Sequence, residues 1–198
     1  MKRTWIWAVL MGVAAGAGVQ AEPEGYQGPG FSATRVETVG GDSETSTIYL
    51  SRHGMREESG PAGHRLVIIS NPDSGKTWVM DEKHRVYQSL AQATAAARDR
   101  RDAEADTLLD PRPCMGFDLT RRLGQEKVAG RMTQKWVCGN SRTRREVMQW
   151  FDPGLKLVIR ERTPHGRQVE LRDIRLADPE AELFRLPAGY REGKVGGR

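Results

Sequence analysis

The sequence contains only two cysteines, Cys114 and Cys138, among its 198 residues. It has no Cys-x-x-Cys pair, which excludes the common thiol redox motif. The four histidines are far apart along the chain and lie next to turn signals: His53, His64, His84 and His165. Since none of them has a partner at the short spacing that zinc sites use, we expect no metal site and no cofactor.

The sequence also lacks the local patterns that carry catalysis. There is no G-x-S-x-G nucleophile elbow and no distinctive carboxylate pair, so we expect a protein that is not an enzyme. A hydrolase would need a nucleophile, a base and an orienting group that the fold brings together from distant positions. The stretch Asp73 to Thr77 resembles the end of a phosphate-binding loop, but Ser70 stands where that loop requires glycine. A β-prone run follows it in place of a helix, and a hairpin turn is therefore the better interpretation.

No strongly charged segment is present either. The chain has 31 Lys and Arg against 26 Asp and Glu, a net charge of +5. The two signs are interspersed, as from Arg98 to Glu104, and no basic patch alternates with aromatic residues. We expect solvated surfaces of mixed sign and no nucleic-acid partner.

The longest apolar run lies at the start of the chain. Lys2 and Arg3 precede an apolar stretch from Trp5 to about Val19, and Val19 to Ala21 forms a small-residue cleavage site. This order is typical of a secretory signal peptide, which would leave no stable membrane anchor after cleavage. The alternative, a retained N-terminal anchor, is less favoured because the run is short and rich in glycine.

Export places both cysteines in an oxidising compartment. We therefore expect a disulfide between Cys114 and Cys138. The alternatives, a two-cysteine metal site or a redox pair, have no supporting motif. Closing a loop of this length stabilises the fold by about 3 kcal/mol in the chain-entropy model.

Turn signals recur roughly every ten residues through the rest of the chain, which is typical of an antiparallel all-β sheet or barrel. The expected strands are Phe31 to Val39, Glu44 to Leu50, Met55 to Ser59, Leu66 to Ile69, Thr77 to Met80, Arg85 to Gln88, Glu126 to Ala129, Arg131 to Cys138, Arg144 to Phe151, Leu155 to Arg162 and Gln168 to Leu176.

One main helix is expected from Leu90 to about Leu109, because it is rich in alanine and Ser89 can cap it. Pro111 to Leu123 would then be a crossover loop, and a short helical turn is expected before Leu186. The expected organisation is a signal peptide at 1–21, a flexible lead-in at 22–30, one domain at 31–190 and a disordered tail at 191–198. The fold class is mainly β, with a strongly curved antiparallel sheet or incomplete β-barrel covered by one main helix.

Large apolar side chains on the expected strands have two interpretations. They fill the core between sheet and helix, or they line a shape-tolerant apolar pocket of the kind that Trp and Met suit. The candidate ligand-lining residues are Trp78, Met80, Trp136, Met148, Trp150 and Ile159.

The order of several segments resembles the LolA-like superfamily of exported bacterial proteins, which includes lipoprotein carriers and many relatives without an assigned function. The segments are LVIISNPDSGKTWVMDEKHRVYQ, GQEKVAGRMTQKWV before WFDPGLKLVIRE, and the closing LFRLPAGY. The resemblance implies an incomplete β-barrel whose concave face is covered by helical segments, and which receives acyl chains in the carriers. We therefore expect a periplasmic, non-enzymatic protein that binds an apolar ligand such as a lipid or a lipoprotein acyl chain. The alternative is an envelope interaction or sensing module with a filled core and a protein partner.

Overall fold

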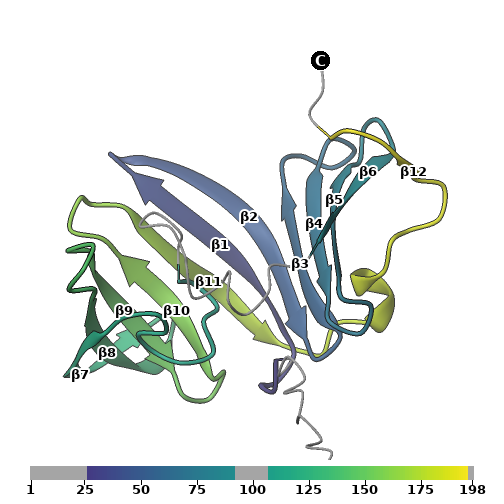
Figure 1. The fold of residues 1–198 in the computed structure, drawn as a ribbon. Helices are drawn as coiled ribbons and strands as arrows, with labels where there is room; N and C mark the ends of the chain where they lie inside the picture. Colours follow the sequence, from purple (N-terminus) through teal and green to yellow (C-terminus); the bar gives the residue numbers. More distant parts are fainter. Residues whose placement is uncertain (1–25, 92–106, 196–198) are drawn as a thin grey trace, which may run out of the picture.

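The computed structural model describes residues 26–91 and 107–195 (Figure 1). Within these residues the chain forms one twelve-stranded sheet and a single 3-10 turn, η1 (Ala181–Phe184). The strands are β1 (Phe31–Val39), β2 (Asp42–Ser51), β3 (Gly54–Ser59), β4 (Leu66–Asn71), β5 (Lys76–Asp81), β6 (Val86–Ala91), β7 (Leu119–Val128), β8 (Arg131–Gly139), β9 (Glu146–Asp152), β10 (Leu157–Arg162), β11 (Gln168–Leu176) and β12 (Arg191–Glu192).

The sheet is two meanders joined at β1. The strand order is β12-β6-β5-β4-β3-β2-β1-β11-β10-β9-β8-β7, and β11 returns to pair antiparallel with β1. The sheet bends so that the β3–β6 part and the β7–β11 part form two walls at an angle (Figure 1). The expected curved antiparallel sheet is confirmed. It is open and does not form a barrel, because β7 and β12 lie at opposite edges and do not pair.

Local turn chemistry explains the predicted hairpins. Gly54 has a φ of 142°, and a Cβ at this position would lie 2.2 Å from the carbonyl oxygen of Ser70, so glycine is required where β2 turns into β3. In the turn between β4 and β5 the backbone N–H of Ser74 donates to the side chain of Asn71 at 2.9 Å. The phosphate-loop-like stretch that begins at Asp73 is therefore a hairpin turn, as predicted.

The expected cover by one main helix is not borne out, since the only helical element among residues 26–91 and 107–195 is η1. Ser89, expected to cap the helix, instead lies in β6 and pairs with Trp78, and Leu90 pairs with Thr77. Strand pairing with β5 overrides the local helix preference there. Residues 92–106, most of the expected helix, lie outside the described residues. The part of the chain that is described contains no helix long and apolar enough to cross a bilayer.

Two further segments differ from expectation. β7 begins at Leu119, inside the expected crossover loop, because its residues pair along the whole of β8. Arg191 and Glu192, expected to be disordered, form β12 and pair in parallel with Val86 and Tyr87 of β6. The short helical turn predicted before Leu186 is confirmed as η1.

The described residues contain three buried apolar clusters. Cluster 1 is Phe31, Ala33, Ile48, Leu50, Leu108, Val128, Trp150, Leu155, Leu157, Ile159, Val169 and Leu171. Cluster 2 is Val67, Ile69, Met80 and Phe184, with Trp78 and other half-buried side chains packed against it. Cluster 3 is Cys114, Cys138 and Val147, with Phe117 and Trp136 beside it. The core is thus divided along the sheet.

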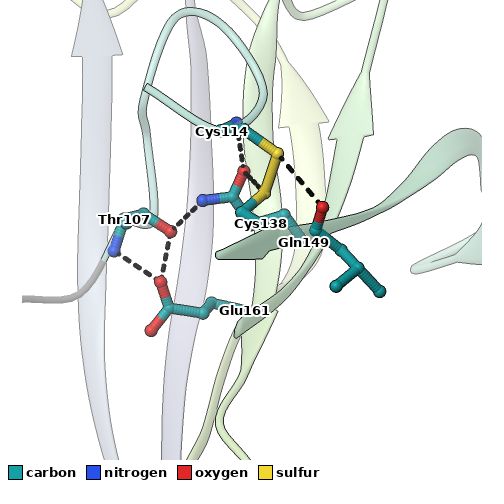
Figure 2. Close-up of a disulfide and its surroundings, with 6 residues drawn as sticks. Thr107, Cys114, Cys138, Gln149 and Glu161 are labelled. Atoms are coloured by element: carbon teal, nitrogen blue, oxygen red, sulfur yellow. Dashed lines mark hydrogen bonds between the residues drawn. A yellow bond between two sulfur atoms is a disulfide. The ribbon is translucent and has the colours of Figure 1, made fainter. Parts of the chain in front are cut away.

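The predicted disulfide is present. Cys114 and Cys138 are bonded across a sequence separation of 24, with Cα atoms 5.1 Å apart (Figure 2). The bond attaches the segment before β7 to β8. In the double variant Cys114→Ser/Cys138→Ser we expect the free energy of unfolding to fall by about 3 kcal/mol. Urea unfolding of the variant, and of the wild type with and without reductant, measures it. A loss below about 1 kcal/mol would contradict a structural role for the bond.

Candidate ligand-binding face

Strand register shows which side chains share a face of the β3–β6 wall. Glu57 pairs with Ile48 on one side and with Ile68 on the other. Val79 pairs with Ile68 and with Gln88. Directly opposed residues project to the same side of an antiparallel sheet, so this row runs across one face from β2 to β6.

The rows on either side add Met55, Leu66 and Leu90 to the same face. Together with Ile68 and Val79 of the first row, these residues form what we call the inner apolar patch. Leu66 is 43 % exposed and Leu90 is 41 % exposed, while the other three are half-buried. Of the patch, only Met55 packs against any of the three clusters formed by the described residues. A pocket of about 150 Å³ adjoins Leu66 at the margin of the patch.

The opposite face of the same wall is filled. Val67, Ile69 and Met80 project there and pack against Phe184 of η1, and all four are at most 2 % exposed. Asn71 fixes this contact, because its side-chain N–H donates to the carbonyl oxygen of Phe184 at 3.0 Å. Figure 1 shows η1 and the C-terminal segment on the side of the wall that faces away from β7–β11. The inner apolar patch therefore faces the other wall.

On the β7–β11 wall the corresponding face is covered by the segment that begins at Thr107. The side-chain amide of Gln149 donates to the Thr107 hydroxyl at 2.6 Å, and its oxygen accepts from the backbone N–H of Cys114 at 2.6 Å (Figure 2). Glu161 accepts from the backbone N–H of Thr107 at 2.9 Å and from its hydroxyl. Gln149 and Glu161 are at most 1 % exposed, so this buried polar network fixes the segment in place.

The outer face of that wall is closed by charge pairs. Lys135 Nζ lies 4.9 Å from the centre of the Trp150 ring, and the Arg160 guanidinium carbon lies 5.3 Å from it. Lys135 also donates to Glu126 at 2.9 Å, which lowers the pKa of that carboxyl. Arg160 donates to Glu170 at 2.6 Å. These charged side chains shield the indole from solvent, and Trp150 is 3 % exposed.

A second set of charges spans β1 and the loop before β11. Burial raises the pKa of Glu37, but hydrogen bonds from Arg167 and Arg35 outweigh it and hold the pKa below its ordinary value. The Nε of Arg167 donates to Glu37 at 2.7 Å. Across the described residues no three His, Cys, Asp or Glu side chains are placed to hold a metal ion. In this part of the sheet Glu37 forms ion pairs with both Arg35 and Arg167.

The six candidate lining residues are distributed over the three clusters. Met80 belongs to cluster 2, beneath η1, and Trp78 packs against that cluster. Ile159, Trp150 and Met148 belong to or pack against cluster 1, and Trp136 packs beside the disulfide in cluster 3. Their role in lining a ligand site stays a prediction.

The inner apolar patch was not among the predicted site residues. Its signal is present in β4, where Leu66 and Ile68 alternate with Val67 and Ile69, so that the strand is apolar on both faces. Such a strand needs cover on two sides. Periodicity alone predicts a strand here but does not show which of its faces a neighbouring segment covers.

Comparisons with known proteins bear on the fold. No protein-family model matches the sequence, and no curated protein matches it. An uncharacterized conserved protein from Thermus thermophilus has a similar structure, with a TM-score of 0.55 and 11 % identity over 85 % of this chain and 91 % of its own. MucB is similar with a TM-score of 0.53 and 18 % identity over 83 % of this chain and 60 % of its own.

The MucA/MucB complex of Pseudomonas aeruginosa contains a similar chain, with a TM-score of 0.52 and 19 % identity over 83 % of this chain and 56 % of that chain. The present chain thus spans little more than half the length of the MucB chains that it matches. At these identities the likeness shows the fold alone. The fold of this chain is therefore similar to that of MucB, which supports the resemblance to the LolA-like superfamily at the level of the fold.

Proposed function

We propose that this protein is an exported, non-enzymatic binding protein that takes a lipid or a lipoprotein acyl chain on the inner apolar patch. The observation that carries the proposal is the patch itself. Leu66 and Leu90 are more than two-fifths exposed beside Ile68 and Val79 on the inner side of a curved sheet. Apolar side chains gathered on a concave surface are the usual mark of a site for an apolar ligand.

The chemistry of the patch suits an acyl chain. It offers aliphatic side chains from β3, β4, β5 and β6. Its rows also contain polar and acidic side chains: Glu57, Ser70, Thr77, Asp81 and Gln88. Each methylene buried on such a surface contributes about 0.8 kcal/mol. About ten buried methylenes would give about 8 kcal/mol, before the cost of ordering the chain is subtracted. Recognition would rest on shape and apolar area.

The LolA-like fold and the signal-peptide pattern support this proposal. The carriers in that superfamily accept acyl chains, and the expected export would place the present protein in the periplasm. Hydrolysis of the ligand would need a nucleophile and a base at the patch. Neither the sequence patterns nor the geometry of the described patch residues suggests such a pair. We therefore propose a binding role without catalysis.

Acidic substitutions on the patch test the proposal. In Ile68→Glu and Leu90→Glu we expect a dansyl-labelled long-chain fatty acid to bind at least about tenfold more weakly, because a carboxylate resists burial against the acyl chain. Fluorescence titration measures the affinity, and circular dichroism checks the fold. The matched control is Leu119→Glu, which places the same charge at an exposed leucine of β7. Equal binding by all three variants, or no binding by the wild type, would refute the proposal.

A protein partner is the second candidate function. MucB in complex with MucA(peri) is similar to this chain with a TM-score of 0.50 and 17 % identity over 81 % of this chain and 55 % of that chain. Here β7 is an edge strand, with Leu119 57 % exposed and Leu123 43 % exposed. An edge strand can accept a strand from a partner. If this function holds, Leu119→Glu will abolish the capture of one dominant envelope protein, whereas Ile68→Glu will not.

A further inference from the structure

A polar pocket of about 260 Å³ lies where β1 meets β11 and β2. Its lining is Ser32, Ala33, Thr34, Thr47, Tyr49, Asp173 and Arg175. Thr34 pairs with Thr47, and Ser32 pairs with Tyr49, so these four side chains share one face of the sheet. Thr34 and Val36 are two residues apart in β1 and therefore project to the same side. Val36 pairs with Glu170, which lies on the outer face with Arg160, so the pocket also lies on the outer face of the sheet. The pocket is therefore separate from the inner apolar patch.

An irregularity in strand pairing creates this pocket. Thr34 pairs with Arg172, but Ser32 pairs with Arg175, so β11 has one residue more than β1 over this stretch. Asp173 has a φ of 50°, in the left-handed region, as is typical of a bulge residue. Ile174 turns the other way and packs against cluster 1. The bulge thus directs Asp173 and Arg175 toward the hydroxyl groups of β1 and β2.

The polar groups of the pocket are not used by the fold. Among the described residues, no hydrogen bond or ion pair involves the side chains of Ser32, Thr34, Thr47, Asp173 or Arg175. Nearby arginines behave differently, since Arg172 pairs with Glu170 and Arg35 pairs with Glu37. Unpaired groups of both charges and several hydroxyls around one concavity are what a polar ligand requires.

We propose that this pocket binds a neutral, hydroxyl-rich ligand: one pyranose unit of a saccharide. A carboxylate accepts hydrogen bonds from neighbouring sugar hydroxyls, a guanidinium donates to their oxygens, and serine and threonine hydroxyls do both. The opposite charges of Asp173 and Arg175 disfavour a simple anion or cation. A zwitterionic amino acid would engage both charges and leave the threonine hydroxyls unpaired. The volume is below the usual range for larger ligands and suits a single ring.

Chemical-shift mapping on the isotope-labelled protein tests this directly. The panel is glucose, galactose and N-acetylglucosamine, with alanine and inorganic phosphate as non-saccharide probes. We expect at least one pyranose to shift the amide signals at positions 32–34, 47–49 and 172–175 to saturation. Saturation by alanine or phosphate alone, or no saturable shift at these positions, would overturn the proposal.

Two variants refine the test without disturbing the backbone. Asparagine tolerates the left-handed conformation as aspartate does, so Asp173→Asn removes the charge at little structural cost. Thr34→Val removes one hydroxyl at nearly constant size. We expect each to weaken pyranose binding by about tenfold or more, whereas Asp73→Asn, in the exposed β4–β5 turn, leaves it unchanged. Undiminished binding by both pocket variants would refute the assignment.

Discussion

Replacing Phe184 with alanine is expected to lower the free energy of unfolding by about 3–5 kcal/mol. The ring is 0 % exposed and packs with Val67, Ile69 and Met80, so truncation leaves a cavity in cluster 2. The measurement is urea unfolding followed by tryptophan fluorescence, since half-buried Trp78 packs against the same cluster.

The control for this variant is Leu176→Ala. Leu176 is 55 % exposed at the end of β11, so its truncation should change stability by no more than about 0.5 kcal/mol. Equal losses in both variants would show that η1 does not form part of the core. In that case the outer face of the β3–β6 wall would be as open as the inner face, and the assignment of one ligand-binding side would fail.

Replacing Gln149 with leucine is expected to lower the free energy of unfolding by about 1–3 kcal/mol, the cost of one unsatisfied buried group. The substitution leaves the buried backbone N–H of Cys114 without its partner. It also removes the amide that donates to the Thr107 hydroxyl, which still donates to Glu161. Leucine has nearly the volume of glutamine, so the loss reports hydrogen bonding more than packing.

Gln125→Leu is the matched control, because Gln125 is exposed on β7 and the chemical change is the same. Denaturant unfolding of both variants should be accompanied by thiol alkylation, to show that the disulfide stays closed. A loss under about 1 kcal/mol for Gln149→Leu would mean that water satisfies these groups and that the network does not hold the segment on the sheet.

The local parts of the fold were predictable from sequence. β1 and β11 have the bounds expected from their residue pattern, because β-branched runs bounded by turn residues specify strands locally. The pairing of β1 with β11 was not predictable, since it joins residues far apart in sequence. The same limit applies at Ser89 and Leu90, where local signals favour a helix but pairing with β5 extends a strand.

The candidate site was harder to predict because alternation identifies two faces without showing which one is filled. Trp78 and Met80 are candidates because Trp and Met suit an apolar pocket. Met80 nevertheless belongs to the cluster beneath η1 and Trp78 packs against it, while Ile68 and Val79 project to the inner side. The polar pocket depends on the bulge at Asp173, and no sequence pattern marks the extra residue in that strand. Both features come from non-local geometry.

The measurement that tests the central claim most directly is native mass spectrometry of the protein purified from its own envelope, followed by extraction and lipid analysis of what it carries. The account predicts a lipid or acylated molecule at near-stoichiometric amount, lost in Ile68→Glu and retained in Leu119→Glu. A clean mass without ligand that persists after incubation with lipids would contradict it.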